Sequence, residues 1–266
     1  MAQEIERQAK LVDAPVPAEY VNRLAQNLAR NSDIKVPVTT KLIDSNEVNA
    51  FALPGGFLFV NSGLVLKAET EAELAIVVAH EIAHVAARHG TRQASRGQLV
   101  DMASVPLIFV GGWAGYAVRQ GVGLAIPLTF LKFSRGFEQE ADFLGLQYIY
   151  KVGYDPTAFI DFFERMEAME KRKPGTVSQL FRSHPNTATR IKFTQKNVEE
   201  ILPARPQYVI TTSEFQQVRD DLRIMANARR AIPEKRGPTL RRPSEDDREG
   251  AKPDQDERPT LKRRDS

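Results

Sequence analysis

The chain has 266 residues, of which 42% are apolar and 27% charged, and its formal net charge is +3. This length is enough for one substantial hydrophobic core. The small charge excess, with basic and acidic residues interspersed, argues against nucleic acid as a partner. There is no cysteine, which excludes disulfide frameworks and thiolate zinc sites, so any metal ligands must be His, Asp or Glu.

The first part of the chain predicts helices followed by a small sheet. Residues 4–30 are expected to form one or two amphipathic helices interrupted by Pro15 and Pro17. The opening residues lack the apolar segment of a secretory signal, as expected for a chain whose leader was removed or for a cytoplasmic protein.

Residues 36–65 change to short apolar runs rich in β-branched and aromatic residues, which predict two or three strands. Gly55 and Gly56 predict a turn between strands. An alternative role for this region is functional, because an edge strand can pair with the backbone of an extended substrate.

Residues 70–90 predict a helix that carries the motif His-Glu-x-x-His. Thr70 and Glu73 form a capping-box pattern, an apolar face follows, and Gly90 is expected to end the helix. His80 and His84 lie one turn apart, so both imidazoles can reach one ion at the roughly 2.0–2.1 Å of Zn–N bonds.

Glu81 is placed differently from the two histidines. It lies about 100° further around the helix axis, where a carboxylate can take a proton from a water on the metal. The alternative is a chance match without a metal. It is disfavoured because burying two unpartnered imidazoles in so apolar a helix would cost about 2 kcal/mol or more each.

Residues 105–131 form an apolar stretch in which Arg119 is the only charged residue. The stretch is long enough to cross a bilayer, but its prolines and glycines interrupt it. Three interpretations stay open: a buried helical pair beside the active site, an apolar lid or membrane-contacting segment, and a transmembrane helix.

The helix predicted for residues 133–154 offers acidic candidates for a third ligand. Glu138 and Asp142 share a face, and Glu140 points elsewhere. Glu138 is the better candidate, because Asp142 one turn later can orient a ligating imidazole. The alternative is an ordinary solvated acidic face.

Further helices are predicted from Asp155-Pro156 and after His184, and a last one from Thr212 or Ser213 to about Arg229. A short strand is predicted for residues 207–210. His89 is expected to be a cation near the end of the motif helix, and His184, taken alone, an ordinary loop residue. Residues 1–231 therefore predict a single domain, and residues 232–266, rich in proline and charge, a disordered tail.

Four separated segments resemble one family in its order: NAFALPGGFLFVNSGLV, ELAIVVAHEIAHV, SRGFEQEADFLGLQY and SHPNTATRI. The chain is similar, over roughly residues 36–200, to the HtpX, BepA and Oma-type zinc metallopeptidases, relatives of the CAAX prenyl protease. It differs from the membrane-spanning members, which have clear spans where this chain has the interrupted stretch 105–131.

The resemblance implies a role for each matching residue. One zinc ion per chain would be bound by His80, His84 and Glu138, with Glu81 as the general base and Asp142 behind the ligands. It also implies that His184 and Arg190 face the active site, where His184 could steady an oxyanion or fill the open position of the metal. The implied fold is α+β, a mostly helical zincin-like domain with a small antiparallel sheet beside the motif helix.

The expected function is that of a zinc endopeptidase acting on unfolded or misassembled proteins of the bacterial envelope. The envelope follows from the resemblance, and a cytoplasmic location stays an alternative. Contact with a membrane is expected, if anywhere, through residues 105–131. The alternative function is a chaperone-like or assembly factor with a quiescent or self-occluded metal site.

Overall fold

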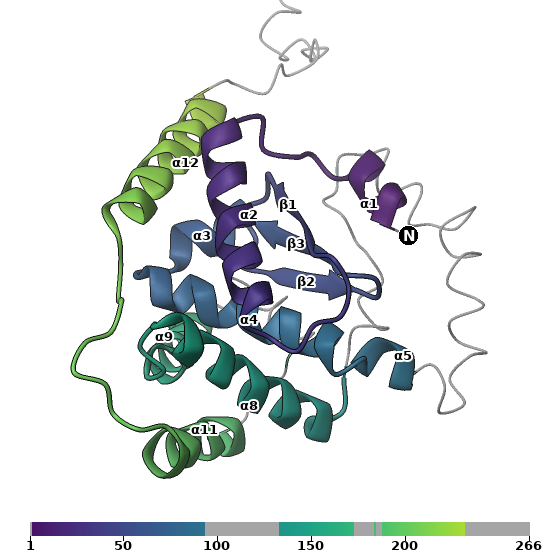
Figure 1. Cartoon of the computed structure of the whole chain (residues 1–266). Coiled ribbons are helices and arrows are strands. Elements are labelled where there is room, and N and C mark those ends of the chain that lie inside the picture. Colours follow the sequence, from purple (N-terminus) through teal and green to yellow (C-terminus); the bar gives the residue numbers. More distant parts are fainter. Residues whose placement is uncertain (1, 94–132, 173–183, 185–187, 232–266) are drawn as a thin grey trace, which may run out of the picture. The chain divides into compact units, whose positions relative to one another are not determined.

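The structure is a computed structural model, which describes residues 2–93, 133–172, 184 and 188–231 (Figure 1). The predicted apolar segment 105–131 and the predicted tail 232–266 lie outside the described residues.

Most described residues are helical, and one small sheet accompanies them, as the α+β prediction requires. The helices before the undescribed segment are α1 (Ala2–Gln8), α2 (Pro15–Arg30), α3 (Ser62–Lys67), α4 (Glu71–Ala86) and α5 (His89–Gln93). Those after it are α8 (Arg135–Val152), α9 (Ala158–Arg172), α11 (Ala188–Ile201) and α12 (Ser213–Ala231). The strands are β1 (Thr39–Ile43), β2 (Ala50–Leu53) and β3 (Phe57–Asn61).

The sheet is mixed, so the prediction of a small antiparallel sheet is confirmed for β2 and β3 and is wrong for β1. The strand order is β1-β3-β2, with β2 antiparallel to β3 and β1 parallel to it. The reason is that the hairpin β2–β3 inserts its second strand next to β1, so that β3 runs in the same direction as β1. Gly55 and Gly56, with φ of 95° and 88°, form the predicted turn of this hairpin.

The motif helix α4 begins as predicted but ends earlier. The Thr70 hydroxyl accepts a hydrogen bond from the Glu73 amide at 3.2 Å and so caps the helix. The helix stops at Ala86, and Arg88 adopts a left-handed conformation with φ of 56°. Such a residue commonly ends a helix, although it is usually glycine. Gly90 therefore does not end α4 but lies within α5.

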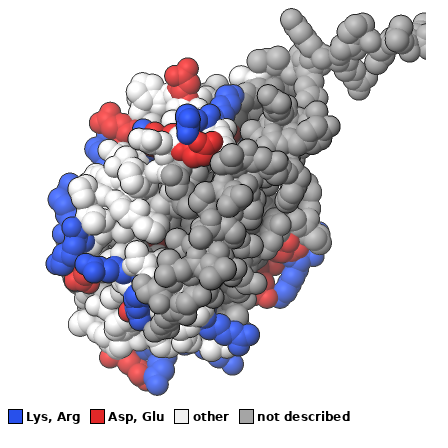
Figure 2. All heavy atoms as spheres, turned by 90° about the vertical axis from the view of Figure 1, so that its right-hand side faces the viewer, with Lys and Arg blue, Asp and Glu red and all other residues white. Residues whose placement is uncertain are grey.

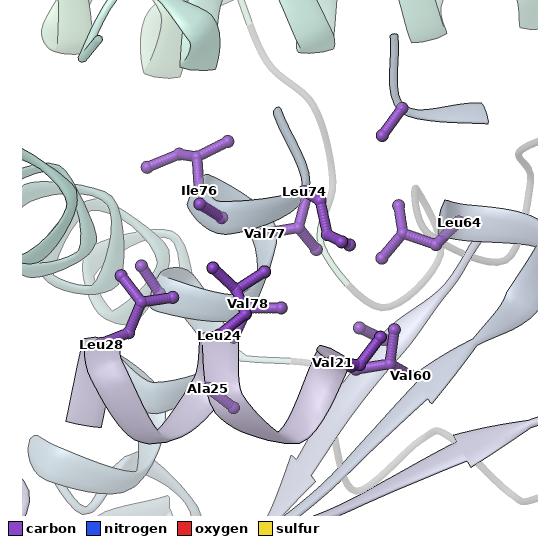
Figure 3. Close-up of a cluster of buried hydrophobic side chains, with 14 of the residues drawn as sticks. Val21, Leu24, Ala25, Leu28, Val60, Leu64, Leu74, Ile76, Val77 and Val78 are labelled. Carbon is purple, nitrogen blue, oxygen red and sulfur yellow. The ribbon is translucent and has the colours of Figure 1, made fainter. Parts of the chain in front are cut away.

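Helix α4 lies at the centre of the fold. It packs against α2, the sheet through β2, and the helices α8 and α9 (Figure 1). Its residues from Glu71 to His84 are buried, which explains why this helix is apolar on every side. Figure 3 shows α4, α2 and the β3–α3 region meeting in one cluster of buried side chains: Val21, Leu24, Ala25, Leu28, Val60, Leu64, Leu74, Ile76, Val77 and Val78.

Helix α8 approaches α4 closely at the first histidine of the motif. A Cβ atom added at Gly145 would lie 3.2 Å from the His80 backbone nitrogen and 3.3 Å from its Cα. Glycine at this position thus lets the two helix backbones come together next to the motif. Ser134 caps the start of α8, where its hydroxyl accepts a hydrogen bond from the Phe137 amide, and Gly153 caps its end.

The described residues after α11 agree with the prediction except for the predicted strand. Thr212 caps α12 by accepting a hydrogen bond from the Phe215 amide at 3.2 Å. The strand predicted for residues 207–210 is reduced to a single bridge between Tyr154 and Val209, so that prediction is wrong. The physical reason is that Tyr154 follows the end of α8 and offers one residue of extended backbone rather than a strand.

Basic and acidic side chains lie close together on the described surface. Figure 2 shows Lys and Arg beside Asp and Glu on one face of the molecule.

Among the described residues, no helix is both long enough and apolar enough to cross a membrane.

Candidate metal centre

Four buried side chains that can bind a metal ion converge beside α4. His80 and His84 come from α4, Glu138 from the first turn of α8, and His184 precedes α11 in the sequence. One donor atom from each lies within 4.8 Å of the others, and all four residues are buried. These residues lie far apart in the sequence, so tertiary packing creates the cluster: α8 brings Glu138 to α4, and the chain before α11 brings His184.

The spacing of the donor atoms fits tetrahedral coordination. Ligands about 2.0–2.1 Å from a tetrahedral ion lie roughly 3.3 Å from one another. The Nε2 atoms of His80 and His84 are 2.9 Å apart, and His80 Nε2 lies 3.2 Å from His184 Nδ1. Glu138 oxygens lie 3.2 Å from His184 Nδ1, 3.5 Å from His80 Nε2 and 3.6 Å from His84 Nε2. This set of nitrogen and oxygen donors therefore fits a divalent metal ion.

Asp142 and Arg190 lie behind these donors. Asp142 Oδ1 is 3.0 Å from His80 Nδ1, the ring nitrogen that faces away from the cluster. The Arg190 guanidinium contacts Asp142 through Nε at 2.7 Å and Nη2 at 2.6 Å, and its Nη1 reaches Glu138 at 3.0 Å. Arg190 thus fixes both carboxylates relative to each other.

Glu81 is held beside the donors but is not one of them. Its Oε2 accepts a hydrogen bond from the Ala52 amide of β2 at 3.0 Å, and its Oε1 lies 3.2 Å from His184 Nε2. Because β2 is at the edge of the sheet, its outward amide is available for this bond. The structure therefore brings all seven sequence-predicted site residues together, whereas Glu140 points away and pairs with Arg92.

The electrostatics of the cluster differ between the two histidines of α4. Burial acts to lower the pKa of His80, but Asp142 and Glu138 outweigh it and raise this pKa to about 9. A metal ion bound to the neutral His80 ring would likewise place a positive charge beside Asp142 and Glu138. Burial and the neighbouring His80 hold the pKa of His84 well below its ordinary value, so this ring stays neutral.

The pKa values of Glu81 and Asp142 shift in opposite directions, because different charges surround the two buried carboxylates. Burial raises the pKa of Glu81, and the nearby His184 and His80 only partly oppose it. Burial also acts to raise the pKa of Asp142, but Arg190 and His80 hold it below the ordinary value. Asp142 is therefore a fixed negative charge, and Glu81 is the better proton acceptor of the two.

His89 differs from its sequence prediction. Its ring is fully buried, stacks on Phe137 and lies with Nδ1 2.9 Å from Nδ1 of His84. Burial lowers its pKa, so the prediction of a cation at the helix end is wrong. The sequence does show a histidine five residues after His84, but the contact of His89 with His84 depends on the turn at Arg88.

Known proteins resemble this chain over more than two thirds of its length. The beta-barrel assembly-enhancing protease of Escherichia coli (strain K12) is 30% identical over 221 residues, which cover 78% of this chain and 43% of that protein. The metalloprotease LoiP of Escherichia coli (strain K12) is 30% identical over 188 residues, covering 70% and 73%. The mitochondrial metalloendopeptidase OMA1 of Schizosaccharomyces pombe is 32% identical over 191 residues, covering 69% and 52%.

The chain spans less than half of the length of the beta-barrel assembly-enhancing proteases that it matches. Residues 15–198 of this chain match the family description "Peptidase family M48". This range includes the four donors, Glu81, Asp142 and Arg190. The chain belongs to peptidase family M48.

Proposed function

We propose that this member of peptidase family M48 is a zinc-dependent endopeptidase that cleaves unfolded or misassembled proteins of the bacterial envelope. The observation that carries the proposal is the buried cluster of His80, His84, Glu138 and His184 with the Glu81 carboxylate beside it. Three nitrogen donors and one carboxylate are a set that zinc binds in proteins. The envelope and the class of substrate rest on the relatives named as beta-barrel assembly-enhancing proteases.

In the proposed reaction, the protein side chains position the groups and move the proton. A bound zinc ion would lower the pKa of a coordinated water and polarise the scissile carbonyl. Glu81 would accept the proton from the attacking water and pass it to the leaving amine, so no covalent intermediate is needed. The Ala52 amide keeps one oxygen of Glu81 in place, which leaves the other for this transfer.

The same edge strand suits a peptide substrate. β2 pairs with β3 on one side, and the side that carries the Ala52 amide faces Glu81. An extended peptide that added to this edge would have its backbone next to the base. We propose this pairing as the way in which a substrate chain is aligned.

The proposal is tested by metal content together with activity. Elemental analysis of the purified chain is expected to give one zinc per chain, and an unfolded protein is expected to be cleaved. A chelator should stop the cleavage, and added zinc should restore it. Cleavage that persists after complete removal of zinc would refute the proposal.

A second candidate function is an assembly factor whose metal site is closed at rest. The observation that favours it is that four protein donors converge, which is typical of closed sites, whereas catalytic sites keep one position open. His184 is the donor nearest to Glu81, with its Nε2 at 3.2 Å. Comparing how the wild type and Glu81→Gln keep an unfolded client soluble, with no cleavage counted, separates this function from proteolysis.

The closed site makes one prediction about His184. The variant His184→Ala should raise basal cleavage several-fold, because it frees a position at the metal. The measurement is the initial rate on an unfolded protein, with zinc content and folding checked for the variant. An unchanged or lower rate in a folded, zinc-loaded variant would contradict the proposed occlusion.

A further inference from the structure

The two histidines of α4 differ in what supports the ring nitrogen facing away from the donor cluster. His80 Nδ1 faces the Asp142 carboxylate at 3.0 Å. His84 Nδ1 faces no carboxylate at this distance among the described residues, and its close neighbour is Nδ1 of His89 at 2.9 Å. His89 in turn places its Nε2 3.2 Å from Glu140 Oε2.

We propose that His89 is a positioning residue that fixes the tautomer and orientation of the metal-binding His84 ring through the hydrogen-bonded series Glu140–His89–His84. This inference rests on the proposed function, because it requires His84 to bind the metal through Nε2. It assigns to His89 the role that Asp142 has behind His80.

The direction of each hydrogen bond follows from the metal-binding role. A His84 Nε2 that binds a metal has no proton, so the neutral ring carries its proton on Nδ1. Nδ1–H of His84 then donates to Nδ1 of His89, which must be unprotonated. The proton of His89 is consequently on Nε2, where it donates to the Glu140 carboxylate. Every donor in the series meets an acceptor, so one tautomer is selected at each ring.

The backbone and the packing hold His89 where its Nδ1 can accept the hydrogen bond from His84 Nδ1. In a continuous helix, a residue five positions after His84 would lie about 140° around the axis and would not face it. The left-handed Arg88 breaks the helix and lets α5 bring His89 back. The His89 ring then stacks on Phe137 at 4.4 Å between centroids, and Phe133 stacks on His84 at 4.1 Å.

Arg92 and Glu140 provide a way to test the outer end of the series. Arg92 Nη1 contacts Glu140 Oε2 at 2.9 Å, so both residues take part in one half-exposed ion pair. Only Glu140 also contacts His89. Removing either residue breaks the same ion pair, but only the loss of Glu140 takes the acceptor away from His89.

The test compares two substitutions of His89 in the full chain. The variant His89→Asn keeps an acceptor oxygen near the position of Nδ1 but loses the ring, whereas His89→Phe keeps a ring and loses the acceptor. Zinc affinity is measured by competition with a chromophoric chelator, and the visible spectrum of the Co²⁺-loaded protein reports the geometry at the metal. We expect His89→Phe to weaken zinc binding about 10–100-fold and to alter the Co²⁺ spectrum, with His89→Asn close to wild type.

The result that would overturn the inference is His89→Phe binding zinc as tightly as His89→Asn or more tightly, because packing alone would then explain the role of His89. If His89→Phe does not fold, variants of the half-exposed Arg92–Glu140 pair test the inference instead. Glu140→Ala should weaken zinc binding several-fold and Arg92→Ala should not, and equal affinities in these two variants would overturn the inference. Failure of the wild type to bind zinc would refute the proposed function instead, so the two failures are distinguishable.

Discussion

At the scale of single residues, Arg190 joins the carboxylates that support the cluster. Its guanidinium is buried and contacts Asp142 through two nitrogens and Glu138 through a third. Burial acts to lower the pKa of Arg190, but Asp142 and Glu138 raise it above its ordinary value. Three charges are thus buried together, and none of them could stay there without the others.

Replacing Arg190 should therefore be strongly destabilising. Arg190→Ala removes the guanidinium partner of the buried Asp142 and Glu138 carboxylates, for which we expect a loss of about 3–5 kcal/mol in the free energy of unfolding. Arg190→Lys should recover only part of it, because an ammonium group cannot make the two-nitrogen contact with Asp142. Urea unfolding of the metal-free protein measures both.

The exposed pair Arg23–Glu19 serves as the control for this prediction. Arg23 is about half exposed and pairs with the exposed Glu19 and Glu214, so Arg23→Ala should leave the free energy of unfolding nearly unchanged. A change for Arg190→Ala as small as that for Arg23→Ala would show that the buried network contributes little to stability.

The sequence predicted some of these residues better than others. His80, Glu81 and His84 follow from helical spacing within one segment, and Glu138 was separated from Glu140 by the face that it shares with Asp142. The positions of His184 and Arg190 depend on tertiary packing, so only the family resemblance indicated them. The contact of His89 with His84 depends on a left-handed residue that is not glycine, and spacing gives no sign of it.

At the scale of the elements, the packing of α8 on α4 sets the distance between Glu138 and the two histidines. At Gly145 the backbones of the two helices approach closely next to His80. The N-terminal cap of α4 was predictable, because Thr70 acts locally, whereas the end of α4 at Ala86 was not. The direction of β1 was not, because it depends on how the hairpin β2–β3 inserts into the sheet.

Gly145→Ala is expected to separate α8 from α4. Alanine would gain up to about 1 kcal/mol in helix propensity, but its Cβ would press on the His80 backbone, and overpacking costs about 1–3 kcal/mol. We expect a net loss of about 1 kcal/mol in stability and weaker zinc binding. Thermal unfolding and zinc competition measure the two effects.

Gly136 offers the matched control on the same helix. An added Cβ there would meet no atom within 4 Å, so Gly136→Ala should leave stability unchanged or slightly increased. Equal behaviour of the two alanine variants would contradict the close packing at Gly145.

At the scale of the whole molecule, buried tyrosines tie distant segments together. The Tyr154 hydroxyl donates a hydrogen bond to Glu71 Oε1 at 2.6 Å, which links the end of α8 to the start of α4. Burial and Glu71 raise the pKa of Tyr154, and burial followed by Glu71 and other groups raises the pKa of Tyr20. Both phenols therefore stay protonated in the folded chain when they would ionise in the unfolded chain.

This arrangement predicts instability in alkali. A raised folded-state pKa contributes stability that is complete below the unfolded value of about 10 and is lost as the pH rises above it. The free energy of unfolding should fall by about 1.4 kcal/mol per pH unit for each such tyrosine above pH 10. Urea unfolding between pH 9 and about 11.5 measures the slope.

The variant Tyr154→Phe isolates one contribution. It should be less stable than the wild type at neutral pH, because Glu71 loses a hydrogen bond. Its stability should fall less steeply above pH 10, since one titrating group is gone. An unchanged slope would contradict the role of Tyr154 in the alkaline transition.

The central claim is that Glu81 moves the proton in a zinc-dependent cleavage, and Glu81→Gln tests it most directly. Glutamine keeps an oxygen for the Ala52 amide but cannot accept the proton, so zinc should stay bound at one ion per chain. The rate of peptide-bond cleavage of an unfolded protein is predicted to fall by about 10²–10⁴-fold. Full cleavage by a zinc-loaded Glu81→Gln protein would contradict the account.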